Sequence, residues 1–249
     1  MYRQTRIPRL RASLWVSVPD KADSLAEVAD LDSGDTAAGA VPSAVASTSL
    51  IVPDGCMDLI VIGGQIVIAG ADSLARTFLG STTPIVGLRF DSGVLPQLLA
   101  TSAGELADRV TPVDDVLTPA TFGTRDADGG GAASVTGAAR TLLDMAGDLT
   151  DRASLDLRPM ALAEHLDIRS GSPAQTVAEA AAQFAYSPRQ LRRLSVEWFG
   201  YGPKHLAKIL RWQAARELIA AGRSRTAAAA EVGYADAAHL RRDERSLIG

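Results

Sequence analysis

Two stretches near the C-terminus carry side chains suited to recognising another molecule through hydrogen bonds. Residues 188–199 hold Arg189, Gln190, Arg192 and Arg193 within two helical turns. An arginine can donate two parallel hydrogen bonds to guanine, and a glutamine can pair in the same way with adenine. Grouped basic and amide side chains on one short segment therefore predict recognition of base edges in duplex DNA.

The segment before these residues has the pattern of a partner helix. Residues 177–184 bring apolar side chains back at helical spacing, and residues 185–187 interrupt the pattern. Ser187 can cap a second helix that has Pro188 at its first position and Gln190 three residues after the cap. Two helices joined by a short turn, the second of them basic, predict a helix-turn-helix unit whose second helix enters the major groove.

The same pattern occurs a second time. Residues 226–232 form another alanine-rich segment, residues 233–235 supply the turn, and Asp236 can cap a basic helix. The Leu-Arg-Arg run at 191–193 aligns with the Leu-Arg-Arg run at 240–242, an offset of 49 residues. With the long helix expected between them, residues 173–249 resemble the DNA-binding domain of the AraC/XylS family of transcriptional regulators. The resemblance implies an all-α domain of two helix-turn-helix units joined by a long helix.

The motifs and the resemblance together define the predicted contacts with DNA. They are Ser187, Arg189, Gln190, Arg192, Arg193, Lys204, His205, Lys208, Ala237, Ala238, His239, Arg241 and Arg242. We expect Lys204, His205 and Lys208, at the start of the linking helix, to contact phosphates. Ala237 and Ala238 are expected to touch thymine methyl groups. Each of these basic side chains has the alternative of being a solvated surface charge.

The charge is divided between the two parts of the chain. The whole chain has a net charge of −4, but residues 173–249 hold 12 Lys and Arg against 7 Asp and Glu, a net charge of +5. The remaining 172 residues carry 13 against 22, a net charge of −9. A basic module attached to an acidic one is typical of a phosphate-binding domain with a separate regulatory domain.

The N-terminal part is predicted to be rich in strands. Residues 1–20 are expected to start with an extended segment that ends near 14–16. Further extended segments are expected at 49–52, 57–62, 65–69 and 84–90, with Gly63 and Gly64 as a hairpin turn. The runs VPDGCMDLIVIGG and GLRF resemble the N-terminal region of one subgroup of AraC-type regulators, which implies a small cupin-like β-barrel. The fold class is therefore α+β, with a regulatory domain over 1–170 and a DNA-binding domain over 171–249.

The remaining segments are predicted to be helices and connections. Helices are expected at 94–99, 102–108, 136–149 and 158–167, and in part of 24–29 within an otherwise irregular acidic stretch from 20 to 48. Loops are expected at 111–112, a hinge at 126–131 and the interdomain linker at 170–173. The two later helices could pair two subunits or pack on their own sheet.

Cys56 and Asp58 invite a chemical interpretation. Cys56 could be a nucleophile or a redox sensor, but the favoured interpretation is a small residue at the start of a strand. The three histidines, His165, His205 and His239, lie far from it in the sequence, and a metal site would need several histidines near the strands. We therefore expect no enzyme activity, no metal and no cofactor, and one cysteine excludes an internal disulfide.

Two positions depart from the family pattern. Ser195 and Glu244 occupy the same place in the two units, where the resemblance implies a large apolar residue. Asp243 and Glu244 also place two acids in the second basic helix, so its charges cancel while residues 188–199 carry +2. Since the chain ends at Gly249, the second unit is expected to be weaker, and the first to supply most of the sequence recognition.

These observations predict a cytoplasmic two-domain transcriptional regulator. No run of 18 apolar residues occurs, so no membrane span is expected. The predicted partners are double-stranded DNA, a small-molecule effector of unspecified identity, RNA polymerase and a second copy of the chain. Two rival hypotheses remain: a degenerate regulator that acts only by pairing with proteins, and a ligand-binding or catalytic N-terminal domain that uses Cys56.

Overall fold

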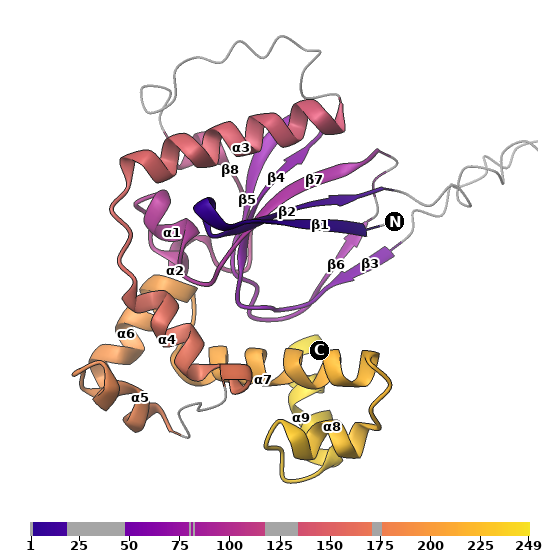
Figure 1. Ribbon diagram of the computed structural model, residues 1–249, viewed down its shortest axis with the longest axis vertical. Helices are drawn as coiled ribbons and strands as arrows, with labels where there is room; N and C mark the ends of the chain where they lie inside the picture. Colours follow the sequence, from indigo (N-terminus) through magenta and orange to yellow (C-terminus); the bar gives the residue numbers. More distant parts are fainter. Residues whose placement is uncertain (1, 19–47, 80, 82, 118–133, 171–175) are drawn as a thin grey trace, which may run out of the picture.

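The computed structural model describes residues 2–18, 48–79, 81, 83–117, 134–170 and 176–249. Within these ranges an antiparallel sheet domain lies above a domain made only of helices (Figure 1). The expected α+β class is thus confirmed. The expected helix within 24–29 and the expected hinge at 126–131 lie outside the described residues, as does most of the expected linker at 170–173.

The main sheet has six strands in the order β1-β2-β7-β4-β5-β8, all antiparallel to their neighbours. Its strands are β1 (Tyr2–Ile7), β2 (Ala12–Ser17), β4 (Met57–Ile62), β5 (Gln65–Ala69), β7 (Ile85–Phe90) and β8 (Val110–Pro112). A separate pair is formed by β3 (Thr48–Ile51) and β6 (Arg76–Leu79). The predicted closed barrel is wrong, because β1 and β8 end the sheet as two open edges.

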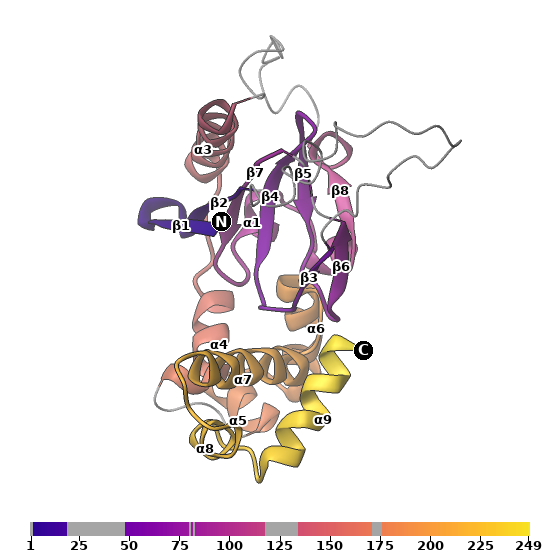
Figure 2. The same cartoon turned by 90° about the vertical axis from the view of Figure 1, so that its right-hand side faces the viewer.

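One face of the main sheet is apolar and packs into the core. Leu14, Leu88, Leu59 and Ile68 lie in register across four neighbouring strands, and the last three are fully buried. The helix α3 (Val135–Arg152) packs on β7 and β4, with Leu142 fully buried (Figures 1 and 2). Alternation along the strands leaves the opposite face to more polar residues.

The helices below the sheet form the second domain. Its members are α4 (Arg158–Leu166), α5 (Val177–Gln183), α6 (Pro188–Phe199), α7 (Pro203–Ala220), α8 (Arg225–Glu231) and α9 (Ala237–Ile248). The long helix α7 contacts α4, α6, α8 and α9. α4, expected to trail the sheet domain, packs on α5 and α7 and so lies with these helices. Below, the sheet domain means residues 2–152 and the helical domain residues 158–249.

The two domains share a continuous apolar core. At one junction, the short helices α1 (Leu95–Leu98) and α2 (Ala103–Leu106) of the sheet domain contact α6. At another, the loop between β3 and β4 meets α7: a Cβ on Gly55 would lie 3.1 Å from Leu206 Cδ1, and Gln213 donates a hydrogen bond to the carbonyl of Pro53. Three short 3-10 turns complete the described elements: Pro8–Leu10, Val113–Asp115 and Ile168–Ser170.

Candidate nucleic-acid interface

The first helix-turn-helix unit consists of α5, a short turn and α6. Ala185 takes a left-handed conformation with φ of 55°, which turns the chain between the helices. Ser187 then caps α6 by accepting a hydrogen bond from the backbone N–H of Gln190, and Gln190 Oε1 accepts one from Ser187 N at 2.9 Å. This reciprocal cap fixes where α6 begins and in which direction it runs.

One face of α6 is buried and the other is basic. Leu191 and Ser195 are fully buried and Trp198 is nearly so, which is the spacing of one helical face. Arg189, Arg192 and Arg193 lie on exposed positions of the other side. None of these three arginines forms an ion pair with another described residue. They are therefore available to a ligand with negative charge.

Ser195 has a partner inside the helical domain. Its Oγ donates a hydrogen bond of 2.8 Å to the carbonyl of Tyr201, in the turn between α6 and α7. A serine in place of a large apolar residue here leaves no unsatisfied hydroxyl, because that bond ties the end of α6 to the start of α7. The departure from the family pattern at this position is thus compensated within the first unit.

The second unit repeats the arrangement with α8 and α9. Ser224 caps α8, Gly233 turns the chain with φ of 78°, and Asp236 caps α9 by accepting from His239 N at 2.6 Å. Leu240 and Leu247 form the buried face of α9. Both units therefore begin their second helix with a side-chain cap, as the sequence predicts.

The acidic pair of the second unit faces inward. Glu244 forms an ion pair of 2.6 Å with Arg225 on α8, and Asp243 lies 3.8 Å from Arg211 on α7. Arg211 also stacks on the ring of Tyr234, 4.7 Å from its centroid. Because both carboxylates point toward cations of the helical domain, the charge cancellation expected along the sequence of α9 does not describe its exposed side.

The exposed side of α9 carries Arg241, Arg242 and Arg245. Arg245 is absent from the predicted contacts, yet it follows Arg242 by three residues and so lies on the same helical face. A helical projection of 236–248 would have grouped it with Arg242 opposite Leu240 and Leu247. We refer to Arg189, Arg192 and Arg193 with these three as the outward arginines.

Four of the predicted DNA contacts form hydrogen bonds or ring contacts with other residues of the protein. Gln190 Oε1 accepts from both the backbone and the hydroxyl of Ser187, so its amide oxygen is committed to the cap. His205 Nε2 lies 2.9 Å from the carbonyl of Ser73 in the sheet domain, and Lys208 Nζ lies 3.3 Å from Ser246 Oγ. His239 packs against the ring of Tyr234 at 5.0 Å between centroids.

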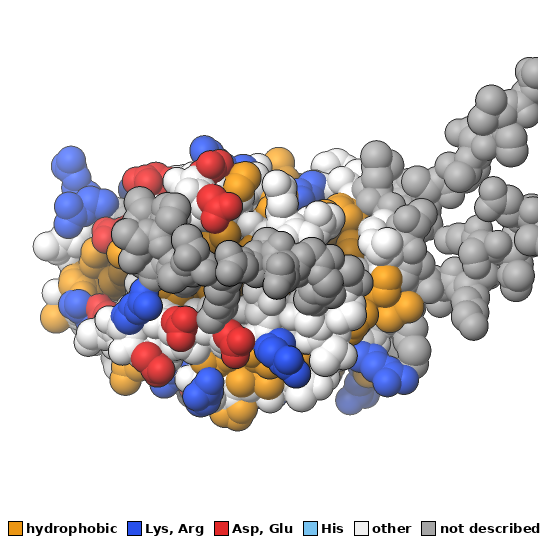
Figure 3. Space-filling view, turned by 90° about the horizontal axis from the view of Figure 1, so that it is seen from above, with side chains coloured by type: hydrophobic (Ala, Val, Ile, Leu, Met, Phe, Trp, Pro, Cys, Tyr) orange, Lys and Arg blue, Asp and Glu red, His pale blue; other side chains and the backbone are white. Residues whose placement is uncertain are grey.

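The other predicted contacts lie at accessible positions near the helix starts. Ala238 is exposed and Ala237 half-buried in the first turn of α9, Ser187 is exposed at the cap of α6, and Lys204 is exposed in the first turn of α7. Both α6 and α9 point their starts away from the sheet domain and their ends toward it (Figures 1 and 2). The structure thus brings the two basic helices to the same end of the molecule. At the opposite, α3 end, the visible surface mixes acidic and basic side chains (Figure 3).

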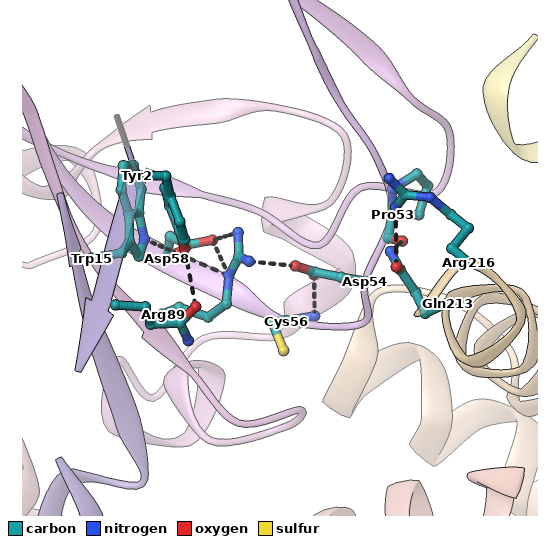
Figure 4. Close-up of polar contacts among 10 residues, drawn as sticks. Tyr2, Trp15, Pro53, Asp54, Cys56, Asp58, Arg89, Gln213 and Arg216 are labelled. Carbon is teal, nitrogen blue, oxygen red and sulfur yellow. Dashed lines mark hydrogen bonds and ion pairs between the residues drawn. The ribbon is translucent and has the colours of Figure 1, made fainter. Parts of the chain in front are cut away.

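The residues around Cys56 form an ion-pair cluster on the polar face of the sheet (Figure 4). Arg89 pairs with Asp54 at 2.9 Å and with Asp58 at 3.3 Å, and Trp15 Nε1 donates to Asp58 at 2.7 Å. The ring of Trp15 lies over Gly87, where a Cβ would come within 2.3 Å of it. These contacts satisfy the buried carboxylate of Asp58.

Cys56 has the environment of a structural thiol. Burial raises the pKa of the Cys56 thiol well above its usual value, and the neighbouring carboxylate of Asp54 adds to the rise. A thiol that stays protonated is a poor nucleophile. Among the described residues no group of three or more His, Cys, Asp or Glu is placed to hold a metal ion.

Comparison with known families agrees with the geometry of the helical domain. A family model described as a helix-turn-helix domain matches residues 180–249. This match supports DNA binding and transcription regulation, and the match is of the AraC type. No curated protein and no solved structure matches the chain. No described helix combines the length and apolar character that a membrane span requires.

Proposed function

We propose that the protein is a transcriptional regulator that recognises a promoter site by placing α6 and α9 in the major groove of duplex DNA. The observation that carries this proposal is the matched pair of capped helices, each with three outward arginines. A helix with its side chains is 10–12 Å wide, which suits a major groove about 12 Å wide. The exposed starts of both helices are the ends that approach base edges in this class of unit.

The proposed DNA contacts fall into two groups, those to base edges and those to phosphates. Arg192 and Arg193, one turn into α6, and Arg241 and Arg242 on α9 are assigned to base edges or the phosphates beside them. Arg245 and Lys204 are assigned to phosphates. The sheet domain is the regulatory part, and a small-molecule effector, a second copy and RNA polymerase remain partners that the proposal allows.

The rival role, limited to pairing with other proteins, drew on Ser195, Glu244 and the short C-terminus. Ser195 and Glu244 both have partners that preserve the units, which supports DNA binding. The rival of a ligand-binding or catalytic N-terminal domain finds no support at Cys56 as a nucleophile, because burial raises the pKa of its thiol. The helical domain therefore supports the DNA-binding proposal, and selection of a DNA site separates it from both rivals.

Selection from random duplex DNA, followed by titration of the full chain with the selected site, tests the proposal. Binding should weaken steeply between 50 and 200 mM salt, because each phosphate contact releases counterions. Arg192→Ala should weaken binding by about 1–3 kcal/mol and relax specificity at one base pair. Arg140→Ala, an exposed arginine on α3, is the matched control and should leave affinity unchanged. A selection that yields no preferred site, or affinity insensitive to salt, would reject the proposal.

A further inference from the structure

The short helix α2 of the sheet domain packs closely against α6. A Cβ on Gly104 would lie 3.2 Å from Val196 Cγ1 and 3.4 Å from the Val196 carbonyl oxygen. A Cβ on Gly200, at the end of α6, would lie 2.9 Å from Ala107 Cβ. The two helices can approach this closely because both positions are glycine. The contact therefore depends on the absence of a side chain at Gly104 and Gly200.

Val196 lies on the face of α6 that carries the outward arginines. It follows Arg193 by three residues and Arg189 by seven, and such residues share one side of a helix. The buried face of Leu191, Ser195 and Trp198 is a different side. The sheet domain thus contacts the face of α6 that DNA would occupy, one turn beyond Arg193.

The groove and the charge around the contact between α2 and α6 also disfavour DNA binding at this face. Around it runs an open groove of about 530 Å³, lined by Gln97, Thr101 and Ser102 of the sheet domain and by Arg193, Glu197 and Trp198 of α6. Glu105, next to Gly104, is exposed. Its carboxylate, at the end of the basic face, repels phosphates that approach it.

The available space leads to the same conclusion. A helix of 10–12 Å fills a major groove of about 12 Å, so no second helix can lie beside the inserted face. The contact of α2 with Val196 partly covers this face of α6 beyond Arg193, and Val196 stays 40% exposed. The second unit is tied to the sheet domain too, because Ala75 N donates a 2.6 Å hydrogen bond to the carbonyl of Leu247 near the end of α9.

We propose that the structure is a closed, self-inhibited state in which the sheet domain restrains DNA binding by docking α2 on the DNA-facing side of α6. High-affinity binding requires α2 to leave α6, while the two helix-turn-helix units keep their own folds. The inference rests on the proposed function, since it assigns regulation to the same DNA-binding helices.

A reversible cross-link across the contact tests it. In a full-length Cys56→Ser background, Gly104→Cys and Val196→Cys place two thiols where the backbones already meet. Oxidation should join them, and the cross-linked protein should bind the selected duplex at least tenfold more weakly than the same sample after reduction. Equal or tighter binding by the oxidised form overturns the proposal. Failure of the two thiols to join under oxidant also overturns it, because the contact would then not exist in solution.

A second variant acts on the sheet domain alone. Gly104→Leu should wedge α2 away from Val196 and tighten DNA binding severalfold, while Ala100→Leu, in the same groove but away from the Gly104–Val196 contact, is the matched control. Unchanged or weaker binding by a folded Gly104→Leu protein contradicts self-inhibition. If neither the parent chain nor any variant binds selected DNA, the proposed function itself fails, which is a different result from a cross-link without effect.

Discussion

At single residues, the two departures from the family pattern show that a polar side chain is tolerated where a hydrogen-bond or ion-pair partner satisfies it. The sequence marks Ser195 and Glu244 as unusual, and both positions prove to be satisfied. Their partners could not be predicted, because one is the backbone carbonyl of Tyr201 and the other, Arg225, lies 19 residues earlier on another helix.

The ion pair between Arg225 and Glu244 should stabilise the second unit. Its side chains are 36% and 26% exposed, so solvent screens the pair and we expect a coupling energy of about 1 kcal/mol. A double-mutant cycle with Arg225→Ala and Glu244→Ala, followed by urea unfolding, measures it. The exposed pair of Arg223 and Glu231, at 4.0 Å, is the control and should show little coupling. Equal coupling in the two pairs would contradict the assigned contact.

Ser195 gives a related prediction in the first unit. Ser195→Ala should destabilise the protein by about 1–3 kcal/mol, because the buried carbonyl of Tyr201 loses its donor. Ser195→Phe should be worse, since the fully buried site has no room for a larger side chain. Midpoints of chemical unfolding report both changes. A stabilised Ser195→Phe protein would show that an apolar anchor fits here after all.

At the scale of elements, prediction succeeded where local chemistry is strong. The strands β4 and β5 begin and end where alternation and the Gly63-Gly64 turn place them, and Ser187 caps α6 as predicted. The strands β6 and β8 were missed, and β1 was expected only as part of one extended segment ending near 14–16 and not as a separate strand. β1 is exposed along nearly its whole length, so its sequence carries no apolar alternation, and its pairing with β2 depends on the rest of the sheet.

The closed barrel was an error of the same kind. The strand segments were largely right, but whether a sheet closes depends on the pairing of its edges, which no local pattern records. In the candidate site, too, local sequence features were predictable and contacts between elements were not. The arginines on α6 and α9 could be found from the sequence, whereas the inward turn of Asp243 and Glu244 depends on packing against α7 and α8.

The caps of the helices give a prediction at this scale. Ser187→Ala should cost about 1 kcal/mol or somewhat more, because it removes the hydroxyl that accepts from the Gln190 backbone N–H and donates to Gln190 Oε1. Ser224→Ala removes a one-sided cap at α8 and should cost less. Unfolding in urea compares the two variants. A larger loss from Ser224→Ala would mean that the second hydrogen bond of the Ser187 hydroxyl, to Gln190 Oε1, adds nothing to α6.

At the scale of the whole molecule, the junction between the domains should respond to pH. Burial lowers the pKa of His205 from its ordinary value of 6.5; Lys208 lowers it further, while the hydrogen bond with Ser73 and the charge of Asp108 oppose the shift. A lowered pKa means that the unfolded chain binds the proton more readily, so stability is lost as pH falls below about 6.5 toward the folded value.

Unfolding measured at pH 7.5 and at pH 5.5 tests this effect with wild type and His205→Gln. The wild type should lose stability at the lower pH, and the variant should lose less because it cannot take up the proton. An identical loss in both proteins would place the pH dependence elsewhere.

The apolar core that runs from the sheet into the helices also determines how cooperatively the protein unfolds on heating. Two lobes with separate interiors melt in two steps, whereas a shared interior couples them into one cooperative transition. Calorimetry of the parent chain should therefore show a single endotherm. A chain wedged open at Gly104 should show a broader endotherm, because α6 loses its contact with α2 while the loop between β3 and β4 still packs on α7.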